Sequence, residues 1–303
     1  MSLRLAIGKA LARGLMKPAM RRQSNAGQAR VAMEWGARLF LRDPPDTRVR
    51  PWGEGGVRLA CGPVVPRGVI LYLHGGGYIA GSPATHRAML ARLSARTGLP
   101  AILPAYPLAP ERPAPAAFDA ARAAFARLVA EGHAPDGIVL GGDSAGGGLA
   151  LALLSDLCRA GTPPRAVFAL SPWTDMTLSG GSLASNARAD PLLPVERIEE
   201  LRGMVLGALA PDDPRVSPLH ARFPGCPPVF LQAAATEILR DDTLRMADRL
   251  RAEGAEVTLD LWPDGIHAWP LAGRWLPEAG QALDRIAAFL RPLTPPRDRQ
   301  GES

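Results

Sequence analysis

Short apolar runs alternate with amphipathic stretches along most of this 303-residue chain. In the amphipathic stretches apolar residues recur every three or four positions, which indicates helices. The runs expected to be strands are 69–73, 100–103, 137–140, 166–170, 228–233 and 256–261, and the expected helices are 84–97, 114–130, 144–160, 241–253 and 278–290. Strands that alternate with helices in this way are typical of a parallel sheet with helices on both faces, so we expect an α/β fold.

Two regions do not follow this alternation. Residues 1–45 have helical spacing only, with a second amphipathic run over 28–41, and about 57 residues separate the strands that end at 170 and begin at 228. An interval of that length is too long for a simple loop, so we expect an insertion with its own helices. The expected division is therefore cap helices over 1–45 and 178–225, an α/β domain over 46–177 and 226–295, and a frayed tail over 296–303.

Composition excludes several classes of protein. The hydrophobic fraction is 47% and aromatic residues make up 5%, while 35 basic and 29 acidic residues give a net charge of +6. The arginines are scattered rather than grouped with aromatic residues, so we expect no nucleic-acid partner. No apolar run approaches the roughly 20 residues of a membrane span, so we expect no stable membrane insertion. The three cysteines are widely spaced, which argues against a disulfide framework or a zinc site, and we expect neither metal nor cofactor.

The N-terminus has no signal-peptide pattern. Basic residues at 4, 9, 13 and 17 interrupt every apolar run before a hydrophobic region of about seven residues can form. We therefore expect a cytoplasmic protein. Because this stretch has apolar residues at helical spacing among those basic residues, a weak role at a membrane surface stays open.

The strongest local motif is Gly142-Asp143-Ser144-Ala145-Gly146, which directly follows one expected strand and begins the next helix. A strand that turns at once into a helix forces its middle residue into a strained conformation, and glycines two positions away remove side chains that would collide. Ser144 is then exposed at the carboxyl edge of the sheet as a candidate nucleophile. The alternative is an ordinary serine at a helix N-terminus.

A second motif, His74-Gly75-Gly76-Gly77-Tyr78, follows the strand 69–73. Three consecutive glycines leave backbone N–H groups unshielded, so that they can stabilise an oxyanion. We expect the N–H groups of Gly76, Gly77 and Ala145 to form this oxyanion hole. The alternatives are a flexible turn and a phosphate-binding loop, but the latter requires a lysine that this segment lacks.

A serine nucleophile requires a base and an acid, which in a sheet of this kind follow it in the order acid, then histidine. Of the two histidines after Ser144, His220 lies in the insertion, whereas His267 lies just after the last expected strand and is the expected base. The residues alone leave the acid open among Glu237, Asp241 and Asp242, which all follow the strand 228–233.

Taken together, the chain resembles the hormone-sensitive-lipase-like branch of the α/β-hydrolase esterases, a family of bacterial carboxylesterases. The resemblance covers about residues 60–290. It depends on five blocks: His74–Gly77, Tyr106-Pro107-Leu108-Ala109-Pro110-Glu111, Gly142–Gly147, Ser171-Pro172-Trp173-Thr174-Asp175 and Asp264-Gly265-Ile266-His267. Two positions depart from the family pattern, since Pro107 stands where an arginine is usual and Ala105 stands where an aspartate is frequent. These departures put a local charge contact in doubt.

The resemblance implies an α/β-hydrolase fold with about eight strands and the triad Ser144, Glu237 and His267, because the family's acid precedes its histidine by about 30 residues. It implies hydrolysis of small carboxylic esters, without cofactor, and the homodimer common in the family. We expect short- to medium-chain substrates in a pocket of roughly 300–1,000 Å³ under the cap. Two alternatives stay open: an amide or N-acetyl deacylase that uses the same triad, and a ligand receptor without enzymatic activity.

Overall fold

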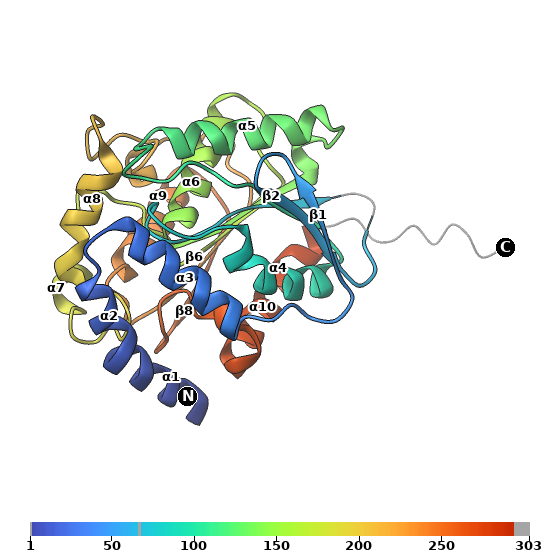
Figure 1. Cartoon of the computed structure of the whole chain (residues 1–303). Coiled ribbons are helices and arrows are strands. Elements are labelled where there is room, and N and C mark those ends of the chain that lie inside the picture. The colour runs from blue at the N-terminus through green and yellow to red at the C-terminus, as the bar shows by residue number, and fades with distance from the viewer. Residues whose placement is uncertain (1, 66–67, 294–303) are drawn as a thin grey trace.

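The alternating segments form one eight-stranded sheet in the computed structural model of the chain, which describes residues 2–65 and 68–293 (Figure 1). The strand order is β1-β2-β4-β3-β5-β6-β7-β8. The first two strands run antiparallel to their neighbours, and the strands from β4 to β8 are parallel. The strands are β1 (Thr47–Trp52), β2 (Gly56–Cys61), β3 (Val69–Leu73), β4 (Ala101–Leu103), β5 (Ile138–Asp143), β6 (Ala166–Leu170), β7 (Val229–Ala234) and β8 (Val257–Trp262).

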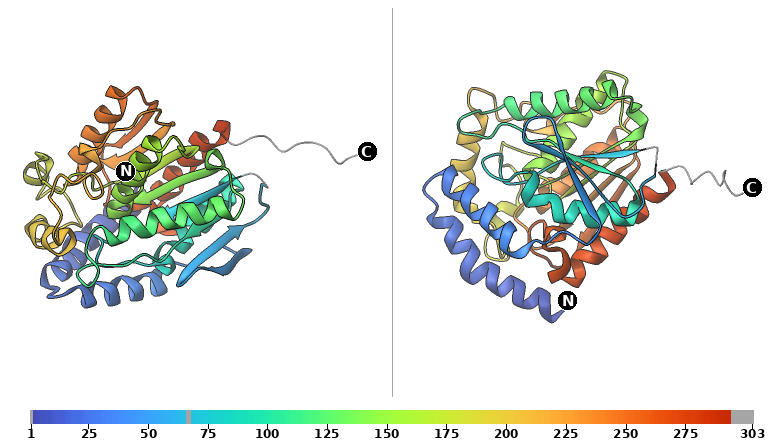
Figure 2. Two further views of the ribbon diagram at one scale, coloured as in Figure 1. Left: turned by 90° about the horizontal axis from the view of Figure 1, so that it is seen from above. Right: turned by 45° about the vertical axis from the view of Figure 1, so that its right-hand side comes forward.

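Helices cover both faces of the sheet, as Figure 2 shows. Helices α4 (Pro83–Thr97) and α10 (Pro277–Leu290) pack on one face, while α5 (Ala116–Ala130), α6 (Ser144–Arg159) and α9 (Arg240–Ala252) pack on the other. Alternate residues of β3 serve the two layers, since Leu71 and Leu73 join the core under α6 and Tyr72 joins the core under α4. The expected fold class is therefore confirmed, with ends of elements that differ from the predicted ones by at most three residues.

The N-terminal segment is helical up to residue 40. It forms α1 (Leu3–Leu11), a π-helical turn η1 (Ala12–Met16), α2 (Lys17–Arg22) and α3 (Ala26–Phe40). Between β6 and β7 the chain forms only short helices, which are α7 (Ser182–Ser185), η3 (Val195–Arg197), α8 (Ile198–Leu206) and η4 (Pro218–His220). Further short helices are η2 (Pro135–Gly137), η5 (Trp269–Trp275) and η6 (Arg291–Leu293). The expected tail 296–303 lies outside the described residues.

The two segments outside the sheet layers are bonded to each other. The Lys17 ammonium is buried and donates to the carbonyls of Ala187 and Asp190, at 2.9 and 2.8 Å. The Arg197 guanidinium donates in return to the carbonyls of Arg21 and Gln23, at 2.8 and 2.6 Å. Since each cation satisfies carbonyls of the opposite segment, the N-terminal helices and the insertion pack as one unit.

Candidate active site

Ser144 occupies a tight turn between β5 and α6. Its φ angle of 53° lies in the left-handed region, which is strained for a residue with a side chain. The flanking glycines leave no room for a larger residue. A Cβ on Gly142 would lie 2.2 Å from the Gly146 carbonyl oxygen, and one on Gly146 would lie 2.1 Å from the Leu73 carbonyl oxygen. The crowding expected from the sequence is therefore present at both glycines.

The glycine loop after β3 lies directly against this turn. The N–H of Gly75 donates to Oδ1 of Asp143 at 2.9 Å, which ties the loop to the residue before Ser144. Gly76 and Gly77 have φ angles of 122° and 62°, and a Cβ on Gly76 would lie 2.3 Å from the Ala80 carbonyl oxygen. Within the described part of the chain, the N–H groups of Gly76 and Gly77 donate to no acceptor. Both groups are thus available to an external oxygen.

Ala145 supplies a third N–H group at the same place. It is the second residue of α6 and is completely buried. The first N–H groups of a helix have no carbonyl four residues back to receive them, and the helix dipole places partial positive charge there. An anion beside Ser144 would therefore meet the N-terminus of α6 as well as the glycine loop.

Buried polar residues contact the glycine loop and hold it in place. Asp143 accepts hydrogen bonds from the Tyr72 hydroxyl at 2.8 Å and from Gly75, and its carboxylate lies 3.2 Å from Nε2 of His86. Burial raises the pKa of Asp143, but the nearby His86 and these hydrogen bonds outweigh burial, so the pKa is lowered. Asp143 therefore remains an acceptor that organises the loop, as its position beside the nucleophile suggests.

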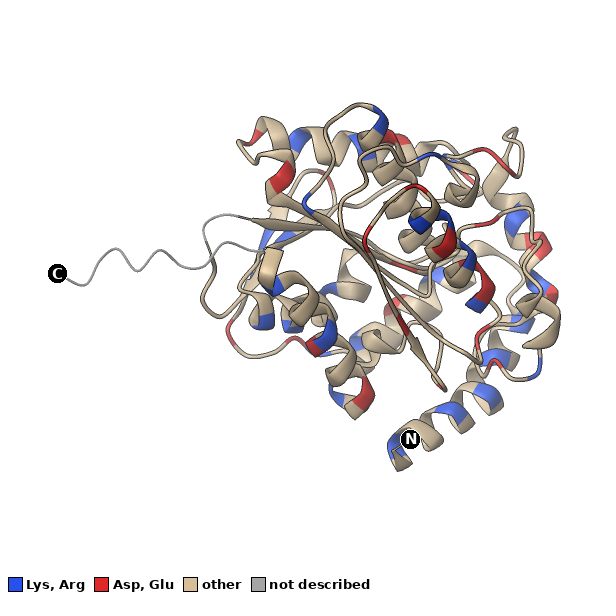
Figure 3. Ribbon diagram, turned by 180° about the vertical axis from the view of Figure 1, so that it is seen from behind, with Lys and Arg blue, Asp and Glu red and all other residues tan. Residues whose placement is uncertain are grey.

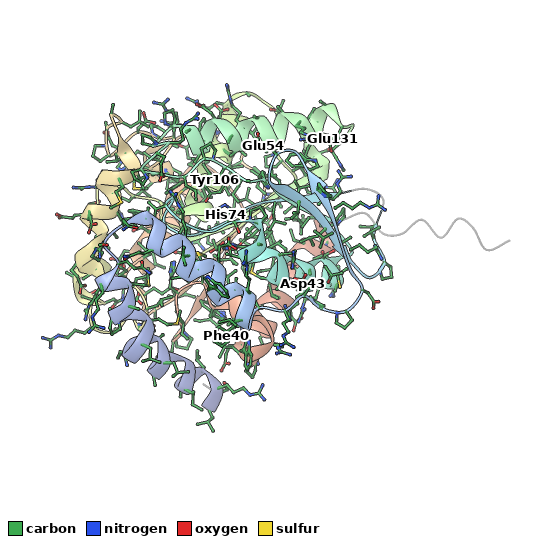
Figure 4. The ribbon with its side chains drawn as sticks, in the orientation of Figure 1. Phe40, Asp43, Glu54, His74, Tyr106 and Glu131 are labelled. Atoms are coloured by element: carbon green, nitrogen blue, oxygen red, sulfur yellow. The ribbon has the colours of Figure 1, made fainter. Side chains whose placement is uncertain are left out.

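His74 remains neutral in this loop. Its ring stacks on Tyr106 with centroids 4.1 Å apart, and Figure 4 shows the two side chains near the centre of the molecule. Burial is the main reason that the pKa of His74 falls to about 3, and the nearby His86 lowers it further. Nδ1 of His74 lies 2.9 Å from the Gly75 carbonyl oxygen, so the ring braces the loop.

Glu237 is the carboxylate that contacts His267. The parallel pairing of β7 with β8 brings the loops after these strands together, and Nδ1 of His267 lies 2.6 Å from Oε2 of Glu237. Oε1 of the same carboxylate accepts from Ala234 N at 2.6 Å and from the Ser171 hydroxyl at 2.8 Å. Glu237 is completely buried, and these three donors hold it in one orientation.

The other two candidate acids point elsewhere. Asp241 accepts from the N–H of Ser182 at 2.7 Å, and Asp242 accepts from the N–H groups of Thr174 and Asp175 at 2.7 and 3.0 Å. Burial raises the pKa of Asp242 to about 7, with a further contribution from Asp175. Both aspartates lie in the first turn of α9 and join that helix to neighbouring loops.

His267 is arranged as a base with one nitrogen occupied and one available. Burial lowers its pKa, but the hydrogen bond and the charge of Glu237 together outweigh burial, so the pKa is raised. Its Nε2 is buried and has no hydrogen-bond partner among residues 2–65 and 68–293. Because Nδ1 is occupied by Glu237, Nε2 is the atom that can exchange a proton with a neighbouring group.

The insertion also reaches the loop that carries Glu237. The Asn186 side-chain amide donates to the carbonyls of Ala235 and Glu237 at 2.8 and 2.7 Å, and Oδ2 of Asp190 accepts from Ile238 N at 2.9 Å. Sequence reasoning missed Asn186 and Asp190, which have no motif around them. It named Ser171 only within a family block and gave it no role, although its position at the end of β6 on the same sheet edge was the available signal.

The block that contains Pro107 is bonded to a distant part of the chain. Glu111 forms an ion pair with Arg30 of α3 at 2.5 Å between Nη2 and Oε2. The same guanidinium donates to the carbonyls of Ile79 and Ala109, at 2.8 and 2.9 Å. An N-terminal helix thus supplies a cation to the block that contains Pro107.

The described residues contain neither a metal-binding cluster nor a membrane-spanning helix. No group of three or more His, Cys, Asp or Glu residues among them could hold a metal ion. No helix in 2–65 and 68–293 is long and apolar enough to cross a bilayer. His220, set aside as a base from the sequence, lies 3.4 Å from Asp175 rather than near Glu237.

Comparison with known proteins places this arrangement in context. Residues 70–271 match the Abhydrolase_3 family, described as an alpha/beta hydrolase fold. An acetyl-hydrolase of Streptomyces hygroscopicus is 37% identical over 74% of this chain and 76% of its own length. An esterase of Acinetobacter venetianus is 34% identical over 92% of this chain and 94% of its own. A crystal structure of an esterase from the bacterial hormone-sensitive lipase family superposes with a TM-score of 0.90 at 36% identity, covering 97% of this chain and 99% of the other.

Proposed function

Since this chain belongs to the α/β-hydrolase family, as a carboxylesterase of the hormone-sensitive-lipase-like branch, we propose that it hydrolyses short- to medium-chain acyl esters through Ser144, His267 and Glu237. The observation that carries the proposal is the 2.6 Å contact between His267 and Glu237, together with the unpartnered Nε2 of the same ring. A histidine held in this way can accept a proton at Nε2. Ser144, on the same sheet edge, is the candidate nucleophile that would give up that proton.

The reaction proceeds in two balanced halves. His267 Nε2 takes the Ser144 hydroxyl proton as Oγ attacks the ester carbonyl, and the protonated ring then gives that proton to the leaving alkoxide as the C–O bond breaks. Water attacks the acyl-enzyme by the reverse sequence, which releases the carboxylic acid and restores the serine. Glu237 keeps Nδ1 protonated and stabilises the imidazolium that forms in both halves.

Negative charge on the substrate oxygen is stabilised by backbone donors. The N–H groups of Gly76, Gly77 and Ala145 form the oxyanion hole in this proposal. The first two donate to no described acceptor, and the third lies at the positive end of α6. Preorganised donors of this kind contribute roughly 3–4 kcal/mol each to transition-state stabilisation in other serine hydrolases.

The cap limits the size of the acyl group. We assign it residues 1–45 and 178–225, over an α/β domain of 46–177 and 226–295. Leu201 of α8 lies so close to the glycine loop that a Cβ on Gly77 would be 2.8 Å from its side chain. Such cover favours acyl chains of about four to eight carbons over long chains, because the bound chain must fit a small-molecule pocket. The Streptomyces relative is named an acetyl-hydrolase, which agrees with short acyl groups. The cytoplasmic location and the homodimer remain predictions.

The test is Ser144→Ala assayed on p-nitrophenyl esters from acetate to palmitate. The variant should lose several orders of magnitude in kcat, because removal of a triad nucleophile costs that much in related enzymes. Retention of more than about a tenth of the activity would contradict the triad. A fluorophosphonate should label the wild-type chain at Ser144, and failure to label an intact protein would favour the ligand-receptor alternative. Matched ester and amide substrates would separate an esterase from a deacylase.

A further inference from the structure

The first helix presents its larger apolar side chains to solvent. Leu3, Ile7, Leu11 and Leu15 recur every fourth residue along α1 and η1, and they are between 51% and 77% exposed. The buried contacts of the same segment are Leu5 and the small Ala12. An amphipathic helix on a globular protein normally turns its large apolar residues inward, so this helix is inverted relative to that pattern.

Helix α3 repeats the arrangement. Val31, Trp35 and Leu39 follow the same four-residue spacing and are between 57% and 62% exposed, whereas its buried residues are alanines. Figure 1 shows α1 at the edge of the molecule and α3 in front of the sheet, where α3 packs against α4. We call seven of the exposed apolar residues in these segments the N-terminal apolar surface. They are Leu3, Ile7, Leu11, Leu15, Val31, Trp35 and Leu39. Exposed apolar residues that follow a periodic pattern on two helices indicate an interaction site.

Positive charge accompanies this surface. Residues 2–42 contain nine basic residues and a single acidic one, Glu34, whose carboxylate accepts from the Ser82 hydroxyl. Figure 3 shows the N-terminal helix with basic residues and no acidic ones. The side chains of Arg4 and Arg22 are exposed and have no ion-pair or hydrogen-bond partner in the described ranges, and the Arg38 guanidinium lies over the Trp35 ring. These cations are therefore free to meet an anionic partner.

We propose that the N-terminal apolar surface docks on a lipid bilayer that carries anionic headgroups. A helix with leucine and isoleucine on one side and arginine beside them lies in the plane of such an interface, and tryptophan is favoured at the same depth. Anionic headgroups supply the negatively charged partners that Arg4 and Arg22 lack within the described part of the chain. A second copy of the chain fits less well, because a symmetric contact would bring the same excess of positive charge against itself.

Vesicle sedimentation of the full-length chain tests this proposal. The wild type should sediment with vesicles of phosphatidylcholine mixed with phosphatidylglycerol, and binding should fall with added salt and with pure phosphatidylcholine. The triple variant Ile7→Gln, Leu11→Gln, Leu15→Gln should bind at least about tenfold more weakly, since it removes three apolar side chains from the interface. Arg4→Gln and Arg22→Gln should each weaken binding by about fivefold.

Matched controls come from α5, which lies at the top of Figure 1 while α1 lies at the bottom. Val129→Gln and Arg122→Gln alter an exposed valine and an exposed arginine there, and should leave binding unchanged. All variants should keep the wild-type melting temperature, because every altered side chain is exposed to solvent.

Three results would overturn the proposal. The first is wild-type protein that stays in the supernatant at low salt with anionic vesicles. The second is a triple variant that sediments as well as Val129→Gln. The third is a wild-type dimer by light scattering that becomes a monomer in the triple variant, without vesicle binding by either, since the surface would then belong to a second copy.

Discussion

Replacement of Glu237 by glutamine tests the proposed acid without changing its shape. In the wild type, Oε1 accepts from Ala234 N and from the Ser171 hydroxyl, and Oε2 accepts from His267 Nδ1. A glutamine has one acceptor oxygen, and two of the three donors lie on the Oε1 side. The amide oxygen should therefore stay with Ala234 and Ser171, so that the NH₂ group faces His267.

This orientation reverses the protonation of the imidazole. An NH₂ donor opposite Nδ1 requires Nδ1 to be the acceptor, so the neutral ring carries its proton on Nε2 and cannot take one from Ser144. The same exchange in the serine-protease triad lowers kcat about 10⁴-fold, which corresponds to about 5.5 kcal/mol of transition-state stabilisation. We expect a loss of that order in Glu237→Gln, with an unchanged KM for p-nitrophenyl butyrate.

The assay compares steady-state hydrolysis of p-nitrophenyl butyrate with the melting temperature of each variant. Asp241→Asn is the matched control, since that carboxylate accepts from Ser182 N in the first turn of α9 and should cost about 1 kcal/mol of stability at most. A folded Glu237→Gln enzyme with more than a tenth of wild-type kcat would refute the reasoning. An inactive but folded Asp241→Asn enzyme would refute it equally.

Three further outcomes are expected. The acidic limb of the pH profile of kcat/KM should have its midpoint above pH 6.5, the ordinary pKa of histidine. The reason is that Glu237 raises the pKa of His267, and His267 must be neutral to act as a base. A midpoint below pH 6 would argue against His267 as the base. Gly146→Ala should lose more than about 3 kcal/mol of unfolding free energy, since its Cβ would meet two backbone carbonyl oxygens at 2.1 and 2.3 Å, whereas Gly203→Ala in open space should be neutral or stabilising in chemical denaturation. Deletion of residues 1–30 should sharply reduce turnover and widen the range of accepted acyl-chain lengths, while a fluorophosphonate still labels the chain. An unchanged chain-length profile would show that these helices are not part of the cap.

The central sheet could be predicted from the sequence because its strands are buried on both faces. All five residues of β3 and of β6 are buried, so these strands read as continuous apolar runs. Strand β1 has the opposite character, since it is an edge strand with four exposed residues in succession and contains Arg48 and Arg50. Strand β1 was not delimited, because an exposed edge strand has no apolar period to detect. Strand β2, which lies inside the sheet, was not delimited either.

The part of the candidate site that could be predicted from the sequence is the part that lies at the ends of the parallel strands. Ser144, Glu237 and His267 each follow a parallel strand, and parallel strands bring such residues to one edge. The choice of Glu237 over the aspartates depended on resemblance, because the three acids lie within six residues and the spacing alone does not orient them. Contacts such as that of Arg30 with Glu111 join residues 81 positions apart, and no local sequence pattern predicts them.

The bonds from Asn186 and Asp190 to the Glu237 loop have a consequence for engineering and for divergence within the family. The segment that we propose covers the substrate also fixes the backbone on both sides of the proposed acid. A chimera that imports a foreign 178–225 segment without an amide and a carboxylate at these positions would leave buried backbone groups unpaired, at about 1–3 kcal/mol each. Changes in substrate range and changes in the acid loop should therefore be inherited as one module, and successful cap exchanges should be those that transfer both together.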